Sequence, residues 1–344
     1  MTACWGITDG SAGMVAQVRS LALAMGLPPE MKIISLKKPW SLLPNICYDS
    51  FLQRFILSHA LRRECYSLLS ICHPALVAVT PPNGGAGDKT NGINCDTRPR
   101  NKCGVTENPD IIISCGRKAA LVALALKKKN PQIKIICIQD PQMSSRHFDV
   151  VVAMQHDRIK SHNVIKTLFA LHSITPEILA EAKEKFMPRF ATYPQPHIAV
   201  LLGGSTNKYT LTKERMEVVI TDLQEWLAGT KGSLLITPSR RTGAENIAAL
   251  QQAFAGNKNV YIYDGVEENP YMGLLACADE IIVTNDSVNM MSEAFATGKP
   301  VTILEMEGHE KTKPARFAEM IKHHPPLKGD EMQKLAGQVR AMLG

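Results

Sequence analysis

The sequence predicts an α/β protein made of two tandem, doubly wound domains. Short apolar segments rich in β-branched residues alternate with helical patterns through both halves of the chain, which is typical of parallel sheets covered by helices. The 344 residues, 45% of them hydrophobic, are enough to bury two cores. Polar, glycine-containing turns follow several strands, at the sheet edge where open α/β folds bind ligands.

The first half, residues 1–190, is expected to form an amino-terminal Rossmann-like domain. Helical patterns cover residues 12–26 and 117–130. Five segments have the length and composition of buried strands, at residues 4–8, 32–36, 110–115, 134–139 and 149–153. Because strands and helices alternate, we expect this domain to face the second one across a ligand-binding cleft.

Residues 191–344 are expected to form the carboxyl-terminal Rossmann-like domain, after a linker in the proline-containing stretch 188–196. Strand patterns lie at 197–202, 233–237, 260–263, 280–284 and 301–304, with helical patterns at 212–228, 244–255, 271–278 and 288–297. The last helix could pack back on the amino-terminal domain.

Two segments of the first half depart from this alternation. Residues 80–108 are rich in Gly, Pro, Asn and Asp and lack periodicity, which predicts a mobile insertion. The glycines at 84–87 do not form a phosphate loop, because no Gly-Lys-Ser/Thr follows them. Residues 47–72 combine apolar and arginine residues at helical spacing. This pattern favours a core-facing helix over one that lies on a membrane.

The composition narrows the environment of the protein. No apolar run approaches the roughly 18 to 20 residues of a membrane span, and the first residues resemble no signal peptide. We therefore expect a cytoplasmic protein that could lie peripherally at a membrane. The nine cysteines are scattered without a CxxC pair, which predicts reduced thiols with neither disulfides nor a metal.

The net charge of +7 is unevenly distributed. Residues 1–190 contain 24 Lys and Arg against 14 Asp and Glu, whereas residues 191–344 contain 15 against 18. The basic first half could attract an anionic membrane surface or an anionic substrate, or be an ordinary solvated surface. Nucleic acid is not an expected partner, because aromatic residues are not interleaved with the basic ones and no known recognition module appears.

The segment 281–301 predicts an anion site in the second domain. A buried strand is followed by Asp286 and Ser287 and then by a helix. Because the first N–H groups of a helix lack internal partners and its amino end is positive, the backbone from Ser287 to Asn289 could hold a phosphate. Glu293, about two turns along, could accept hydrogen bonds from a pair of sugar hydroxyls. The alternative is that Asp286 or Ser287 only caps the helix and Glu293 is solvated.

Three other strand-end loops contain residues suited to a phosphate-bearing ligand. Small residues let a backbone approach a ligand at a helix start, and two neighbouring guanidiniums could grip a diphosphate. Each loop alone is weak evidence, but the two in the second domain together with the segment above make three loops in one domain, which indicates a shared ligand. The residues concerned are Asp9, Gly10, Ser11 and Gly13 in the first domain, and Gly203, Gly204, Ser205, Lys208, Ser239, Arg240 and Arg241 in the second.

His156 and Asp157 form a further candidate pair in the first domain. They follow the strand at 149–153, and an imidazole beside a carboxylate could act as a general base. A single histidine at a domain edge is more often structural.

These residues together resemble the mitochondrial-fission ELM-like family, which is similar to the GT-B nucleotide-sugar glycosyltransferases. The resemblance extends through most of the chain and rests on the motifs at residues 7–10, 109–117, 138–141, 156–157, 202–204, 237–242 and 284–301. It implies a GT-B-like fold with a nucleotide sugar bound to the second domain.

The resemblance also implies roles for individual residues. Gly204 and Ser205 would approach the diphosphate, Glu293 would accept the ribose hydroxyls, and backbone groups of Asp264 and Gly265 would meet the base. No cofactor or metal would be needed. The first loop departs from the family pattern, because Met14-Val15-Ala16 follows Gly13, which leaves Asp9 and His156 as candidate catalytic bases.

Two classes of function follow from this resemblance. The first is a metal-independent, inverting glycosyltransferase that acts on a lipid or cell-envelope acceptor, with a nucleotide-sugar 2-epimerase as a variant. The second is a non-catalytic scaffold of the mitochondrial-fission type, since plant members of the family are implicated in recruiting a dynamin-related protein.

Overall fold

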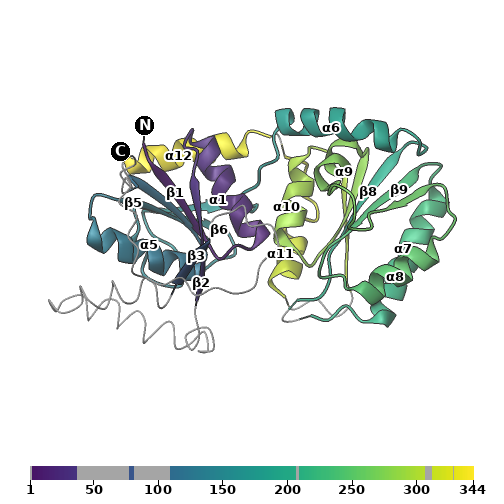
Figure 1. The fold of residues 1–344 in the computed structure, drawn as a ribbon, viewed down its shortest axis with the longest axis horizontal. Coiled ribbons are helices and arrows are strands. Elements are labelled where there is room, and N and C mark those ends of the chain that lie inside the picture. The colour runs from purple at the N-terminus through teal and green to yellow at the C-terminus, as the bar shows by residue number, and fades with distance from the viewer. Residues whose placement is uncertain (1, 37–76, 81–108, 207–208, 307–311, 328) are drawn as a thin grey trace, which may run out of the picture. The chain divides into compact units, whose positions relative to one another are not determined.

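The computed structural model describes residues 2–36, 77–80, 109–206, 209–306, 312–327 and 329–344. The chain divides into two compact units: unit 1 contains residues 1–168 and 333–344, and unit 2 contains residues 169–332. The expected helix at 47–72, the expected insertion at 80–108 except for its first residue, and Lys208 lie outside the described residues. Each unit is described by itself below (Figure 1).

The described part of unit 1 contains a seven-stranded sheet in the order β3-β2-β1-β4-β5-β6-β7, in which only β3 runs antiparallel to its neighbour. The strands are β1 (Cys4–Thr8), β2 (Glu30–Leu36), β3 (Val77–Thr80), β4 (Ile111–Cys115), β5 (Lys134–Ile138), β6 (Val150–Met154) and β7 (Val164–Thr167). The helices are α1 (Ala12–Ala24), α5 (Arg117–Lys129), the 3₁₀ helix η3 (Ser145–His147) and α12 (Glu331–Leu343).

The core of unit 1 follows from its apolar strands and a helix with a small-residue face. Ile112, Ile135 and Val151 are fully buried in the central strands, and Ala119 and Ala123 of α5 pack against the same cluster. Alanines on this face let the helix lie close to a sheet whose strands are β-branched.

The described cysteines are buried free thiols. Cys4, Cys115, Cys137 and Cys277 form no disulfide. Burial raises the pKa of the Cys4 thiol to about 11 and that of Cys137 to about 12. A protonated thiol is a poor nucleophile and a poor metal ligand, so these two side chains act as small apolar groups.

The described part of unit 2 contains a five-stranded parallel sheet in the order β10-β9-β8-β11-β12. Helices α7 and α8 lie on one face, and α9 and α10 lie on the other (Figure 1). The strands are β8 (His197–Leu202), β9 (Ser233–Pro238), β10 (Val260–Ile262), β11 (Glu280–Thr284) and β12 (Val301–Leu304). The helices are α6 (Pro176–Phe190), α7 (Lys213–Gly229), α8 (Ala244–Ala253), α9 (Tyr271–Cys277), α10 (Val288–Ala296) and α11 (Lys313–Ile321).

Every expected strand and helix in the described residues is present, with bounds that differ by no more than two residues. Five described elements were not expected from the sequence, namely β3, β7, the 3₁₀ helix η3, α6 and α11. The proline-containing stretch expected to be a linker begins inside α6, which includes Pro188. Unit 2 begins at Phe169, about twenty residues before the expected boundary, because α6 packs on α9 of the same unit.

Gly273→Ala is expected to destabilise unit 2. A Cβ at this position of α9 would lie 2.3 Å from Cγ of the buried Phe186 side chain and 2.5 Å from its Cβ. Overpacking of this kind costs about 1–3 kcal/mol and should outweigh the higher helix propensity of alanine. Gly337→Ala in α12 is the matched control, because nothing lies within 4 Å of its added Cβ. Thermal and urea unfolding should show a loss for the first variant and no loss for the second, and similar shifts would contradict the packing argument.

Candidate functional site

The strand order of each unit reverses at one point, and candidate loops lie at both reversals. In unit 2 the chain runs outward from β8 to β10 and then returns to β11, which pairs with β8. In unit 1 the corresponding reversal lies between β1 and β4. Crevices at the carboxyl ends of strands beside such a switch point are where open α/β sheets bind ligands.

Asp286 joins the loops at the switch point of unit 2. Its carboxylate is fully buried and accepts hydrogen bonds from the Gly204 N–H at 3.1 Å and the Thr284 hydroxyl at 2.7 Å. It also forms an ion pair with the Arg241 guanidinium at 2.7 Å. A buried carboxylate needs such partners. One side chain therefore ties together the loops that follow β8, β9 and β11.

The two glycines after β8 fit this arrangement because they have no side chain. A Cβ on Gly203 would lie 1.8 Å from a carboxylate oxygen of Asp286, and one on Gly204 would lie 2.2 Å from the backbone carbon of Arg241. The Gly203 N–H donates to the Thr284 hydroxyl at 2.8 Å. The sequence predicted these glycines as places where a ligand approaches the backbone. The structure adds that the loops themselves pack too closely for a side chain.

The loop after β9 is locked to the glycine loop. The Thr242 hydroxyl donates to the Gly203 carbonyl at 2.6 Å, and the Ser205 N–H donates to the Arg241 carbonyl at 2.9 Å. The Ser239 hydroxyl accepts the Arg241 N–H at 3.2 Å. The Arg241 side chain is 39% exposed and Arg240 is exposed. A cationic rim therefore lies beside the glycine loop.

Ser287 directly precedes helix α10; its hydroxyl accepts the Met290 N–H at 3.4 Å and its carbonyl accepts the Met291 N–H. Ser287 is therefore the N-cap, as the alternative interpretation of the sequence expected. Asn289 is partly exposed in the first turn of this helix. The amino end of α10 is thus at the switch point, directly after Asp286.

Glu293 is not a freely solvated side chain. The Tyr271 hydroxyl donates to its Oε2 atom at 2.5 Å. Burial raises the pKa of the Glu293 carboxyl, and the hydrogen bond from Tyr271 partly opposes that rise. A carboxyl with a raised pKa at the ligand-binding side of a sheet is a candidate functional group.

The loop after β10 presents Asp264 and Gly265 to solvent. Gly265 adopts a φ of 85°, and Asp264 accepts the Val266 N–H at 2.9 Å. Ion pairs from α6 hold the end of this loop, since Arg189 contacts Glu267 and Lys185 contacts Glu268. The two candidate residues therefore lie at the tip of an anchored loop.

In unit 1 the candidate loop lies at the start of α1. Asp9 is exposed and accepts the Ser11 N–H at 3.0 Å, while Gly10 adopts a φ of 84° that favours glycine. Ser11 occupies the N-cap position without making a side-chain cap, and Gly13 lies in the first turn. On the other side of the switch point, Gly116 adopts the same φ after β4.

His156 and Asp157 follow β6 in the same unit. Nε2 of His156 lies 3.7 Å from the Asp157 carboxylate, and the two side chains are 15% and 9% exposed. Asp157 also accepts the Met154 N–H at 3.1 Å, and Lys166 donates to the Asp157 carbonyl at 2.6 Å. Asp157 therefore stabilises the turn that positions the imidazole. Its predicted part in catalysis stays a prediction.

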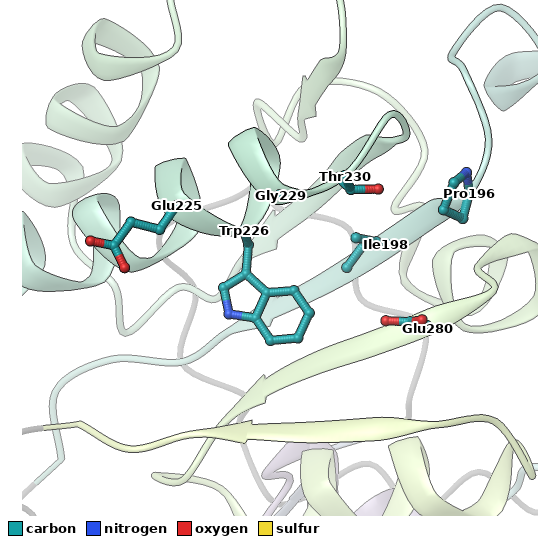
Figure 2. Close-up of a pocket in the computed structure, with 7 residues that line it drawn as sticks. All are labelled: Pro196, Ile198, Glu225, Trp226, Gly229, Thr230 and Glu280. Carbon is teal, nitrogen blue, oxygen red and sulfur yellow. The ribbon is translucent and has the colours of Figure 1, made fainter.

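A hollow of about 490 Å³ lies at the opposite, amino-terminal edge of the sheet in unit 2 (Figure 2). Pro196 and Ile198 line it at the start of β8, Glu225 and Trp226 near the end of α7, and Glu280 at the start of β11. The hollow contains two carboxylates and no basic lining residue. It is therefore a poor match for a diphosphate, and the carboxyl edge remains the candidate site.

No three His, Cys, Asp or Glu side chains in the described ranges gather so that they could hold a metal ion. No helix of the described part is both long and apolar enough to cross a membrane.

The two sheets and their connections define a GT-B fold, in which two Rossmann-type units follow each other. The structure is similar to the UDP co-structure of MnaA from S. aureus, with a TM-score of 0.53 and 11% identity over 100% of this chain and 97% of that one. It is also similar to a putative UDP-N-acetylglucosamine 2-epimerase from Listeria monocytogenes, with a TM-score of 0.53 and 11% identity over 99% and 88% of the two chains. Because the sequence identity is 11% in both cases, these similarities show that the fold is shared.

The chain belongs to the family described as Mitochondrial fission ELM1, which it matches over residues 12–329. It is 30% identical over 240 residues to mitochondrial fission protein ELM1 of Arabidopsis thaliana. The match covers 63% of this chain and 56% of the plant protein, so the chain spans little more than half the length of that relative.

Thr242, Thr284 and Tyr271 were missing from the predicted site residues. The two threonines bind the glycine loop, and Tyr271 binds Glu293. Both threonines fall inside motifs that the sequence analysis singled out, which was the available signal. Tyr271 had no such signal, because its partner lies 22 residues away on another helix.

Asp286→Ala is expected to lower the free energy of unfolding by about 3 kcal/mol, the scale of breaking a buried ion pair. The variant leaves the Gly204 N–H and the Thr284 hydroxyl without their acceptor and the Arg241 guanidinium without its counter-charge. Asp264→Ala is the control, because that carboxylate is exposed and should cost under about 1 kcal/mol. Urea unfolding compares the two, and equal losses would show that Asp286 does not hold the loops together.

Glu293→Gln is expected to change how stability depends on pH. The folded-state pKa of Glu293 is raised, so this group stabilises the fold below its ordinary pKa, and that contribution is lost as pH rises through the raised value. Glutamine can still accept from Tyr271 but does not titrate. The stability of the wild type relative to this variant should therefore fall as pH rises above 4.5, the ordinary pKa of the group, in urea unfolding. The exposed Glu280→Gln variant should show no such trend, and a flat difference for Glu293→Gln would contradict the burial argument.

Proposed function

We propose that the protein binds a nucleoside diphosphate sugar on unit 2 and transfers the sugar to an acceptor without the help of a metal ion. The main support is the glycine loop at the switch point, with Arg240 and Arg241 on its rim and Asp286 fixing its geometry. The names of the structures that share the fold support the ligand class, since one holds UDP and the other is called a UDP-N-acetylglucosamine 2-epimerase.

The diphosphate would lie over the glycine loop and the amino end of α10. Backbone N–H groups at a helix start and exposed guanidiniums both favour an anion there. Asp286 would not touch the phosphates, because its carboxylate is buried; it would instead hold Arg241. The residues assigned to diphosphate binding are Gly203, Gly204, Ser205, Lys208, Ser239, Arg240, Arg241, Ser287 and Asn289.

The nucleoside would extend from the diphosphate toward α9 and the loop after β10. Glu293 would accept hydrogen bonds from the ribose hydroxyls, and backbone groups of Asp264 and Gly265 would meet the base. This assignment uses a carboxylate that is already held by a hydrogen bond from Tyr271.

In the transfer step, an acceptor hydroxyl would attack the anomeric carbon while the bond from that carbon to the diphosphate oxygen breaks. The arginines and the positive end of α10 would stabilise the negative charge that develops on the leaving diphosphate. Asp9 or His156, the latter oriented by Asp157, would remove the proton of the acceptor hydroxyl. Attack from the face opposite the diphosphate would invert the configuration of the anomeric carbon.

The acceptor would be a lipid or a cell-envelope precursor. The basic first half of the chain favours such an anionic partner or an anionic membrane surface. The loop of Gly10, Ser11 and Gly13, at the switch point of unit 1, would lie on the acceptor side.

A non-catalytic scaffold is the second candidate function. It is favoured by the family description and by the name of the Arabidopsis relative, which both refer to mitochondrial fission. A 2-epimerase is a third, favoured by the name of the Listeria structure. These two alternatives differ from the proposed transferase in one respect: neither a scaffold that binds no nucleotide nor an epimerase needs a molecule that accepts the sugar.

Arg240→Ala tests the diphosphate assignment. Calorimetric titration with UDP, ADP and GDP, and with the corresponding nucleosides, should show binding of at least one diphosphate to the wild type. The variant should lose about 1.5–3 kcal/mol of diphosphate affinity, the strength of a hydrogen bond to a charged group, and little affinity for the nucleoside.

Lys231→Ala is the control, because it removes an exposed cation that precedes β9 at the opposite edge of the sheet. Equal losses for diphosphate and nucleoside would exclude the role given to Arg240. No binding of any diphosphate by the wild type would favour the scaffold.

A further inference from the structure

Tyr271 and Glu293 link two helices at the site proposed for the nucleoside. Tyr271 is the first residue of α9, and Glu293 lies in the second turn of α10. The tyrosine hydroxyl donates to one carboxylate oxygen, Oε2, at 2.5 Å. Nothing in the proposed transfer chemistry uses this tyrosine, so its position calls for another explanation.

The hydrogen bond limits how Glu293 can be oriented. A free glutamate side chain samples several rotamers, and binding a ligand to one of them costs conformational entropy. The Tyr271 hydroxyl occupies one acceptor position of the carboxylate, which has about four. The remaining positions are enough for a pair of ribose hydroxyls, provided that the carboxylate stays in one orientation.

Tyr271 also connects Glu293 to the loop that follows β10. Its N–H donates to the Asn269 side chain at 3.0 Å, at the end of that loop. The Tyr263 hydroxyl donates to the Glu267 carbonyl at 3.0 Å, and Arg189 of α6 forms an ion pair with the Glu267 carboxylate. Tyr271 therefore joins the Glu293 carboxylate to the end of the loop after β10, and separate contacts hold Glu267 two residues before Asn269.

We infer that Tyr271 is a positioning and specificity-determining residue, which holds the Glu293 carboxylate so that the site selects nucleotides with an intact ribose. This inference rests on the proposed function, because it requires that unit 2 binds a nucleoside diphosphate. It adds that discrimination between ribose and deoxyribose depends on a tyrosine that does not itself touch the ligand.

The role of Tyr271 can be measured through the pKa of the Glu293 carboxyl. Burial raises the pKa of this carboxyl, and the Tyr271 hydrogen bond lowers it. Among the ionisable groups of the described residues, Tyr271 is the one whose contact with Glu293 shifts the pKa of that carboxyl. Removing the hydroxyl should therefore raise the pKa further, and a protonated carboxyl accepts fewer hydrogen bonds from a ribose.

The test uses the full chain with Tyr271→Phe, which keeps the aromatic ring and removes the hydroxyl. Calorimetry measures UDP, ADP and GDP against their 2′-deoxy forms between pH 5 and pH 8. The wild type should prefer the ribonucleotide. The variant should bind it about tenfold more weakly, as expected when a misoriented Glu293 carboxylate loses one hydrogen bond from the ribose. It should also lose most of its preference for the ribonucleotide over the deoxy form. As the pH is lowered, the affinity of the variant should begin to fall at a higher pH than the affinity of the wild type.

Tyr193→Phe is the matched control, because it makes the same chemical change in a tyrosine that packs on Tyr261. It should leave affinity, preference and pH dependence unchanged. A ¹³C NMR titration of the Glu293 carboxyl without ligand provides a second measurement, in which Tyr271→Phe should raise the pKa. An unchanged value would overturn the inference even if the variant binds weakly because it is less stable.

The outcomes separate this inference from the function on which it rests. If the wild type binds a nucleoside diphosphate and Glu293→Gln removes its ribose preference while Tyr271→Phe retains both the preference and the pH profile, the proposed function stands and the role of Tyr271 is wrong. If the wild type binds no nucleoside diphosphate, both are wrong.

Discussion

The buried carboxylate of Asp286 is the interaction on which the candidate site of unit 2 depends. An ionised side chain without solvent contact is costly, and here the cost is offset by an N–H from the loop after β8, a guanidinium from the loop after β9 and a hydroxyl at the end of β11. Because Asp286 and these partners lie at the ends of three neighbouring strands, the carboxylate sets the relative positions of all three loops. The glycines at 203 and 204 belong to the same arrangement, since a side chain at either would displace Asp286 or the loop of Arg241.

This arrangement lies where the topology of the sheet also favours a ligand. The strand order reverses between β8 and β11, so the loops that leave these strands lead to helices on opposite faces of the sheet (Figure 1). Unit 1 has the same reversal between β1 and β4, with glycines at positive φ after both strands. Each unit of the GT-B fold therefore has its own switch point, and the loops proposed for the donor and the acceptor lie at different ones.

Glu293 illustrates how a functional site differs from the core around it. A carboxyl whose pKa is raised by burial does not favour folding at neutral pH, and an apolar residue would pack there without that cost. The tyrosine beside it limits the penalty through one hydrogen bond. A residue that contacts a ligand is expected to be costly for folding and to be held in one orientation. The proposed ribose site would explain why Glu293 is kept at this buried position.

The sequence by itself determined the βαβ order of both units, the fold class and the family, because apolar periodicity and strand-end turns are local patterns. Strands 4–8, 197–202, 280–284 and 301–304 were predicted to the residue. It did not predict α6, because the prolines from Pro188 onward suggested a linker, nor β7, whose Val-Ile-Lys-Thr sequence is only half apolar. The candidate loops were predicted from composition, and the structure brings those after β8, β9 and β11 together.

Only the tertiary structure decided what the residues of those loops do. Asp286 was expected to face a ligand or cap a helix, and it is instead a buried partner of Arg241, from a loop about forty-five residues earlier in the chain. Glu293 was expected to be solvated or to accept hydrogen bonds from sugar hydroxyls, and in the structure it accepts a hydrogen bond from Tyr271. These contacts join residues that no periodic pattern relates, because chain segments far apart in the sequence meet only when the strands pair and the helices pack on them.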